Sequence, residues 1–98
     1  MSGLVSIIVP VYRAAAYIAD TIEMVFSQTY GRWELLLVDD CSGDGSVEVI
    51  EKRLSAYEHH PAETAIENVG RVEEYLCGDE KKVFLICKNK NEGADHHN

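Results

Sequence analysis

The feature that most constrains the fold of this chain is an uncharged run rich in β-branched residues, Val5–Val9, closed by Pro10. Because the run shows no alternation of apolar and charged residues, it predicts a strand that is buried on both faces. Strands of that kind are typical of parallel sheets. Trp33–Val38 repeats the pattern, so we expect a second parallel strand beside the first.

The segments that follow these two strands show helical spacing. The first helix is predicted within Ala14–Gln28, and Asp44 or Ser46 is expected to cap the second. Each helix has an apolar stripe on one face. The stripe positions are Ile18, Ile22, Val25 and Phe26 in the first helix, and Val47, Ile50, Leu54 and Tyr57 in the second.

A third helix is predicted in the atypical segment 55–82. Pro61 can open it, and the apolar positions between Ala62 and Leu76 have compatible spacing, although Gly70 interrupts them. Val83–Cys87 is expected to form a third strand. The predicted order is β-α-β-α-α-β, and the predicted fold class is α/β, with three layers and a parallel Rossmann-like sheet.

Size and charge narrow the classes of function. The 98 residues suffice for one small domain, and 46% hydrophobic with 27% charged residues is ordinary globular composition. The formal net charge of -8 disfavours nucleic acid and anionic membranes as partners. The charge of a bound diphosphate would therefore need a metal ion, a helix terminus or a basic residue.

The sequence gives no sign of export. Its longest uncharged apolar run, Leu4–Tyr12, is too short to cross a bilayer, and no basic stretch precedes it. The expected location is cytoplasmic or the cytoplasmic face of a membrane. The three cysteines lack Cys-x-x-Cys spacing, so reduced thiols are expected rather than disulfides or a zinc site.

Polar loops follow the first two predicted strands. Pro10–Arg13 follows the first strand and Asp39–Gly45 follows the second. Because adjacent parallel strands end at the same rim of a sheet, both loops should meet there. A ligand site at this rim is the default hypothesis.

Three segments in this order, Val5–Tyr12, Ser27–Tyr30 and Trp33–Ser46, closely resemble the opening of family 2 glycosyltransferases. The resemblance covers residues 4 to 54 and, more loosely, Asn91–Gly93, whereas residues 55–82 match no pattern of the family. It implies the amino-terminal part of an A-type glycosyltransferase fold, a nucleotide-sugar donor as partner, and manganese or magnesium as cofactor of the full-length enzyme.

Carried over by position, the resemblance implies that Pro10 and Tyr12 line a nucleoside pocket and that Asp40, with Asp39 beside it, meets the base and ribose. Arg13 stands where the family usually has asparagine, and a surface role for it is favoured over contact with the diphosphate. Two alternatives stay open. The two aspartates can instead organise a turn, and the tyrosine can be a rim aromatic in water.

The resemblance also implies what the chain lacks. The family's Asp-x-Asp, catalytic carboxylate and acceptor half lie beyond its last residue, so no catalytic or metal residue is assigned. We expect a single partial domain, residues 1–98, that is inactive in isolation. A stand-alone nucleotide-binding or regulatory module is the alternative. A phosphoacceptor receiver domain fits poorly, because its acidic pair follows the first strand rather than the second.

The resemblance bears on association as well. In the family a fourth strand pairs beside the first, and without it Val5–Val9 becomes an open edge. No lysine blocks this edge. We expect a homo-oligomer that forms through the first strand.

Overall fold

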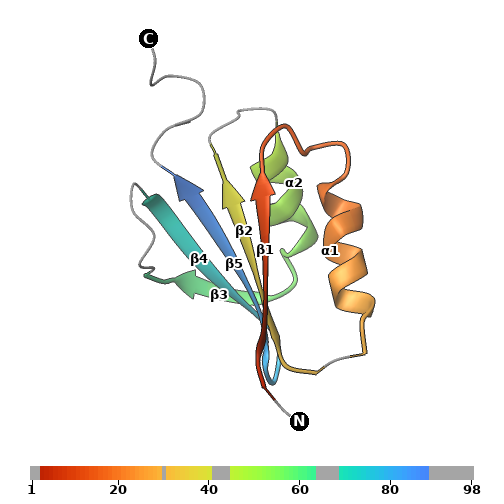
Figure 1. Cartoon of the computed structure of the whole chain (residues 1–98). Coiled ribbons are helices and arrows are strands. Elements are labelled where there is room, and N and C mark those ends of the chain that lie inside the picture. The colour runs from red at the N-terminus through yellow and green to blue at the C-terminus, as the bar shows by residue number, and fades with distance from the viewer. Residues whose placement is uncertain (1–2, 30, 41–44, 64–68, 89–98) are drawn as a thin grey trace.

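The computed structural model describes residues 3–29, 31–40, 45–63 and 69–88. Within these ranges the chain forms two helices and five strands (Figure 1). In chain order they are β1 (Val5–Val11), α1 (Ile18–Ser27), β2 (Trp33–Asp39), α2 (Ser46–Arg53), β3 (Glu58–Pro61), β4 (Val69–Gly78) and β5 (Lys81–Lys88).

The five strands form one mixed sheet in the order β1-β2-β5-β4-β3. Strands β1, β2 and β5 are parallel, whereas β4 runs antiparallel to β5 and β3 antiparallel to β4. The α/β class with a parallel core is thus confirmed, and the first two βα units lie where the sequence predicts them. The strand β5, last in the chain, lies in the middle of the sheet.

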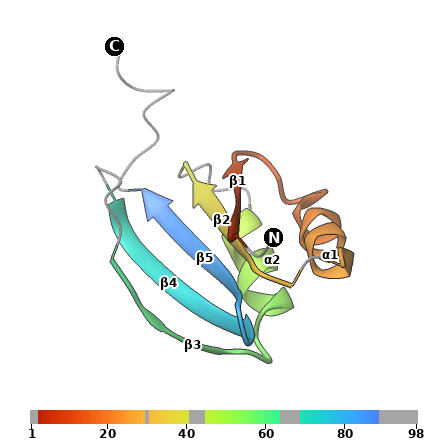
Figure 2. The same ribbon diagram turned by 60° about the horizontal axis from the view of Figure 1, so that its bottom comes forward.

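Both helices cover the same face of the sheet, as the two ribbon views show (Figures 1 and 2). Their apolar stripes pack on the side chains that β2 and β5 direct toward this face, because alternate strand residues point the same way. The fully buried members include Ile18, Ile22, Leu35, Leu37, Ile50, Leu54, Val83 and Leu85. Within the described residues the other face carries no helix, so two layers are seen there instead of the predicted three.

The predicted third helix is wrong. The segment 55–82 contains β3, β4 and the start of β5, and two residues, Asp79 and Glu80, connect β4 to β5. Val72 opposes Ile86, and Tyr75 opposes Val83, on opposite faces of the sheet. A strand with apolar side chains on both faces can show the same spacing as a helix. The segment forms a strand because it pairs with β5.

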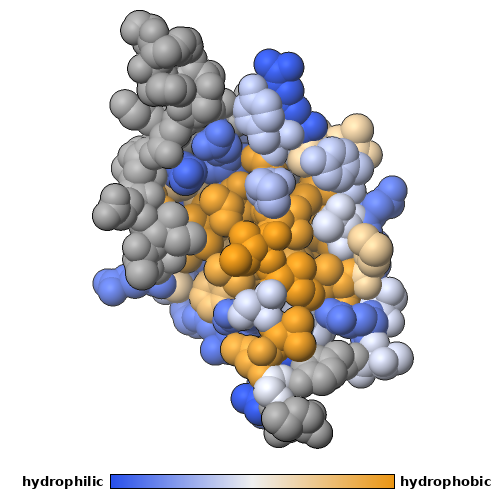
Figure 3. Space-filling view, viewed as in Figure 1, coloured by the Kyte–Doolittle hydropathy of each residue, from blue (hydrophilic) through white to orange (hydrophobic). Residues whose placement is uncertain are grey.

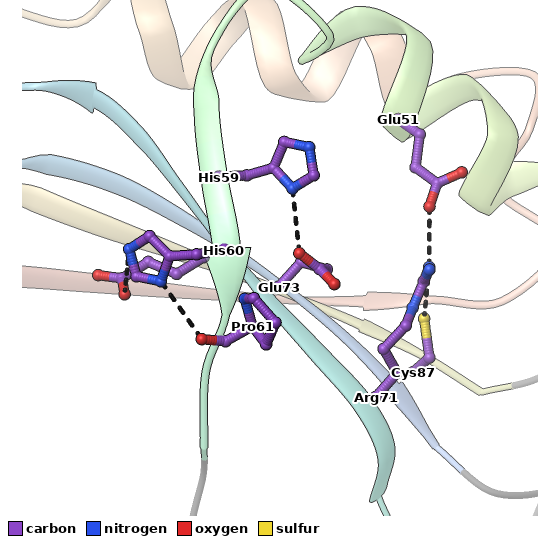
Figure 4. A network of polar contacts seen from close by, with 8 residues as sticks. Glu51, His59, His60, Pro61, Arg71, Glu73 and Cys87 are labelled. Carbon is purple, nitrogen blue, oxygen red and sulfur yellow. Dashed lines mark hydrogen bonds and ion pairs between the residues drawn. The ribbon is translucent and has the colours of Figure 1, made fainter.

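Cross-strand polar contacts join β3 to β4 (Figure 4). The Nδ1 atom of His59 lies 3.0 Å from an Oε atom of Glu73, and Nε2 of His60 lies 3.6 Å from Glu74. Lys82 on β5 reaches the same Glu74 at 3.0 Å. Both histidines are half exposed, so each pair adds at most about 1 kcal/mol. The two histidines thus form cross-strand contacts that join β3 to β4.

Neither described helix has the length and apolar character that crossing a membrane requires.

Candidate site at the carboxyl ends of the parallel strands

The two polar loops predicted to meet start side by side, as far as their described residues show. Val11, the last residue of β1, stands opposite Asp39, the last residue of β2. Immediately beyond them, the amide of Asp40 donates a hydrogen bond of 3.1 Å to the carbonyl of Val11. Tyr12 follows Val11 directly, so the structure brings together the aromatic and carboxylate residues that the sequence singled out.

The chain turns sharply after β1 at Arg13, whose φ is 55°. Among the described residues other than glycine, this is the one with positive φ, a conformation that costs energy and often marks a functional turn. The guanidinium of Arg13 lies 5.3 Å from the ring centroid of Tyr12. Both side chains are exposed, so the pair places a cation and an aromatic face at the rim.

A buried serine of α2 fixes the position of this loop. The Oγ atom of Ser46 accepts a hydrogen bond of 3.1 Å from the amide of Ala14, and both residues are fully buried. The prediction that Ser46 caps α2 is therefore wrong, because Ser46 is the first helical residue and the N-cap is Gly45. Asp44, the other predicted cap, lies outside the described residues.

The two neighbouring aspartates have different surroundings. Asp39 is 6% exposed and lies between Val11 and Cys87 in the register of the sheet, on the side that the helices cover. Asp40 is only partly buried and lies beyond the end of β2. Of the two carboxylates, Asp40 is therefore the more accessible to a ligand.

A basic residue that the sequence analysis missed lies further along the same end of the sheet. Arg71 of β4 stands opposite Cys87, which stands opposite Asp39. Its Nη2 atom donates to an Oε atom of Glu51 at 2.8 Å and lies 3.7 Å from the sulfur of Cys87 (Figure 4). These two contacts, the one to Cys87 first, raise the pKa of Arg71. The residue was overlooked because its segment was taken for a helix.

The described surface also contains a hollow of about 260 Å³, but this lies at the opposite end of the sheet. It is lined by Leu4, Arg32, Trp33, Glu34, Asp79, Glu80 and Lys82. Two of these charged residues, Arg32 and Glu80, form an ion pair with each other. Ligands of parallel α/β sheets bind at the carboxyl ends of the strands, so we take the rim, rather than this hollow, as the candidate site.

The described part of the rim offers few ligands for a divalent metal. Within the ranges that the structure describes, no group of three or more histidine, cysteine, aspartate or glutamate side chains could hold one. Asp40 alone is too few ligands for Mg²⁺ or Mn²⁺, which favour several oxygen ligands. The loosely matching tail, Asn91–Gly93 and the residues after it, lies outside the described residues.

The fold and the rim together define an α/β domain whose candidate site follows the first two parallel strands. The sequence profile described as Glycosyl transferase family 2 matches residues 6–65, well over half of the chain. The chain therefore belongs to glycosyl transferase family 2.

Several curated proteins are similar to the chain. The glycosyltransferase GlyG of Streptococcus pneumoniae is 41% identical over 52% of this chain. The Escherichia coli enzyme WfgD, a UDP-Glc:alpha-D-GlcNAc-diphosphoundecaprenol beta-1,3-glucosyltransferase, is 51% identical over 44% of it. The minor teichoic acid biosynthesis protein GgaA of Bacillus subtilis is 36% identical over 74%. The matches span 17% of each of these relatives. No solved structure matches the chain.

Proposed function

We propose that this domain binds the nucleoside diphosphate part of a sugar donor at the rim formed by the ends of β1 and β2. The observation that carries the proposal is the hydrogen bond from the Asp40 amide to the Val11 carbonyl, which holds Asp40 next to the loop of Tyr12. Membership of the family supports glycosyl transfer as the reaction of the whole enzyme.

The chemistry of the rim suits a nucleoside. The Asp40 carboxylate can accept hydrogen bonds from the imide of a pyrimidine or from ribose hydroxyls. Tyr12 offers an exposed ring on which a base can stack. Pro10, the next-to-last residue of β1, is exposed near them and offers a rigid surface to the base. We propose uridine as the nucleoside, since the printed name of the relative WfgD specifies UDP-glucose.

The diphosphate is the part of the donor that an acidic chain is least suited to bind. Two features of the rim favour it. Arg13 is exposed there, and α2 begins there, since Ser46 at its first turn contacts the loop after β1. A helix amino terminus and a guanidinium both attract phosphate oxygens. We propose that the metal expected for the full-length enzyme, manganese or magnesium, is held by further ligands besides Asp40.

Titration with uridine diphosphate tests donor binding. We expect weak binding in the millimolar range, with shifts confined to backbone resonances of Tyr12, Arg13 and Asp40. Asp40→Asn should weaken it by about tenfold to a hundredfold, because a hydrogen bond to a charged group is worth about 1.5 to 3 kcal/mol. Asp79→Asn is the matched control, since Asp79 is an exposed aspartate in the turn between β4 and β5. Equal binding by both variants would remove Asp40 from the site.

We further propose that the isolated chain transfers no sugar. The described carboxylates of the rim are one buried and one partly buried aspartate, to which no role as base or metal ligand is assigned. Incubation of the pure chain with a uridine diphosphate sugar and manganese should release no nucleoside diphosphate above background. Release that follows the concentration of the chain, and that Asp40→Asn abolishes, would contradict this proposal while supporting donor binding.

A further inference from the structure

The loop after β1 is anchored by the buried residues on either side of it, Val11 and Ala14. The carbonyl of Val11 accepts a hydrogen bond from the residue just beyond β2, and the amide of Ala14 donates one to the first residue of α2, each 3.1 Å long. Tyr12 and Arg13 lie between these anchors, and both are exposed. Hydrophilic side chains gather at this end of the molecule, beyond the hydrophobic face of the sheet (Figure 3).

Arg13 adopts a backbone conformation that most residues with a side chain avoid. Its φ is 55°, in the left-handed region, which glycine and asparagine adopt at lower cost. Strained residues of this kind persist where the surrounding structure fixes the chain, and they cluster at ligand sites. The turn alone would favour asparagine or glycine, so the arginine at this position indicates a role for its guanidinium.

The surroundings of this guanidinium differ from those of the other three arginines, each of which forms an ion pair with a glutamate. The pairs are Arg32 with Glu80, Arg53 with Glu23 and Arg71 with Glu51. Within the described residues, the guanidinium of Arg13 pairs with no carboxylate and instead lies 5.3 Å from the ring centroid of Tyr12. The described rim thus carries a positive charge that no neighbouring carboxylate neutralises.

The guanidinium and a bound base compete for the ring of Tyr12. A base stacks on the face of an aromatic ring, and a cation is attracted to that face as well. A base that stacks on the covered face therefore displaces Arg13. A nucleoside has no group that replaces the lost contact, whereas a diphosphate can accept two parallel hydrogen bonds from the planar guanidinium.

We propose that Arg13 makes the rim selective for a nucleoside diphosphate over the nucleoside alone. Without a ligand, its guanidinium lies on the ring of Tyr12. When the donor binds, the base takes this place on the ring and the guanidinium moves to the diphosphate. The change needs only side-chain rotation, because the anchors fix the backbone of the turn. This role of Arg13 rests on the proposed function, since it sets the selectivity of the same site.

Titrations with uridine and with uridine diphosphate measure this selectivity. EDTA is present throughout, so that no metal ion binds the phosphates. The unmodified chain should bind uridine diphosphate about tenfold to a hundredfold more tightly than uridine, as expected for hydrogen bonds to a charged group. Both ligands should shift the resonances of Tyr12, and only the diphosphate should slow hydrogen exchange at Nε of Arg13.

Three variants assign the selectivity to the guanidinium. In Arg13→Asn the preference for uridine diphosphate should be lost and uridine should bind as before or more tightly, while the midpoint of urea unfolding stays the same or rises. Arg13→Lys keeps the charge without the planar fork, so it should keep only part of the preference. Arg32→Asn is the matched control, because it removes the same charge at the opposite end of the sheet and should leave the preference unchanged.

The outcomes separate the role of Arg13 from the binding of the donor. If neither ligand shifts Tyr12 or Asp40, the proposed function fails, and the role of Arg13 fails with it. If the unmodified chain shows no preference, or if Arg13→Asn keeps it, nucleoside binding stands and the role of Arg13 is refuted. An equal loss of both ligands in Arg13→Asn, together with a lower urea midpoint, would show that Arg13 acts only on the turn and would overturn the proposed selectivity.

Discussion

At the scale of single residues, two neighbouring aspartates at the carboxyl end of the sheet differ in how far they are buried. Asp39 is enclosed beside Cys87, while the next residue, Asp40, is partly open to solvent and hydrogen-bonded through its amide to β1. The carboxylate of the residue just beyond the strand is thus more accessible than the carboxylate of the strand's last residue.

The cysteine thiols provide a prediction at the same scale. Burial raises the pKa of Cys77 to about 11, and burial also raises that of Cys87, although Arg71 opposes the latter shift. In a Cys41→Ser variant, alkylation should therefore be slow at pH 8 and should keep rising with pH up to about 11. In urea the same rates should level off at a lower pH, close to the ordinary pKa of a thiol.

The sign of the effect on stability follows from the same shifts. Between pH 9 and pH 11 the folded chain keeps the thiol proton that the unfolded chain loses, so the free energy of unfolding should fall as pH rises through this window. In a variant that carries both Cys41→Ser and Cys87→Ser, the remaining alkylation rate is that of Cys77. Thiols that react equally fast in folded and unfolded chains would contradict the burial of both.

The position of Tyr12 and Asp40 at the ends of β1 and β2 could be predicted, because both follow strands whose apolar runs are unambiguous. The sequence could not rank Asp39 against Asp40, since burial depends on which strand lies on the far side of β2. It also missed Arg71, whose place opposite Cys87 depends on pairing between β4 and β5 rather than on any local pattern.

At the scale of elements, the start of α2 depends on a glycine. Gly45 is the N-cap and has a φ of 93°. For a residue other than glycine this conformation costs about 1 to 2 kcal/mol. Gly45→Ala should lower the free energy of unfolding by about that amount in urea denaturation. Gly31→Ala is the control, because Gly31 is exposed and an added methyl group would meet nothing within 4 Å.

A loss of stability that is equal in the two glycine variants would mean that the left-handed conformation of Gly45 is not what matters. The prediction has a further consequence for the rim. Ser46 follows Gly45 and holds Ala14, so a distorted start of α2 should also disturb the loop after β1.

The helices α1 and α2 and the strands β1 and β2 were predictable, because the spacing of their apolar residues is distinct and each element is local in sequence. The strand β4 was not, because Val72 and Leu76 face one side of the sheet and Tyr75 and Cys77 face the other. Together these positions repeat at helical intervals. Only the presence of β5 as an antiparallel partner reveals that the segment is a strand.

At the scale of the whole molecule, the fold combines a parallel part that matches the family with an antiparallel part that lies mostly beyond the match. The family profile ends at residue 65, before β4 begins. The candidate site lies wholly within the matched part. The segment 55–82 was expected to match no pattern of the family, but the profile covers it as far as residue 65. This segment extends the sheet on the side away from β1.

The central place of β5 has a consequence for synthesis on the ribosome. Before residues 81–88 emerge, the β1–β2 pair and the β3–β4 pair have no strand in common, because each borders the position that β5 will fill. Insertion of β5 brings Val83 against both Leu35 and Tyr75, which joins the two halves through long-range contacts. The nascent chain therefore cannot complete its sheet gradually, strand after strand, and becomes one cooperative unit only when its last described strand arrives.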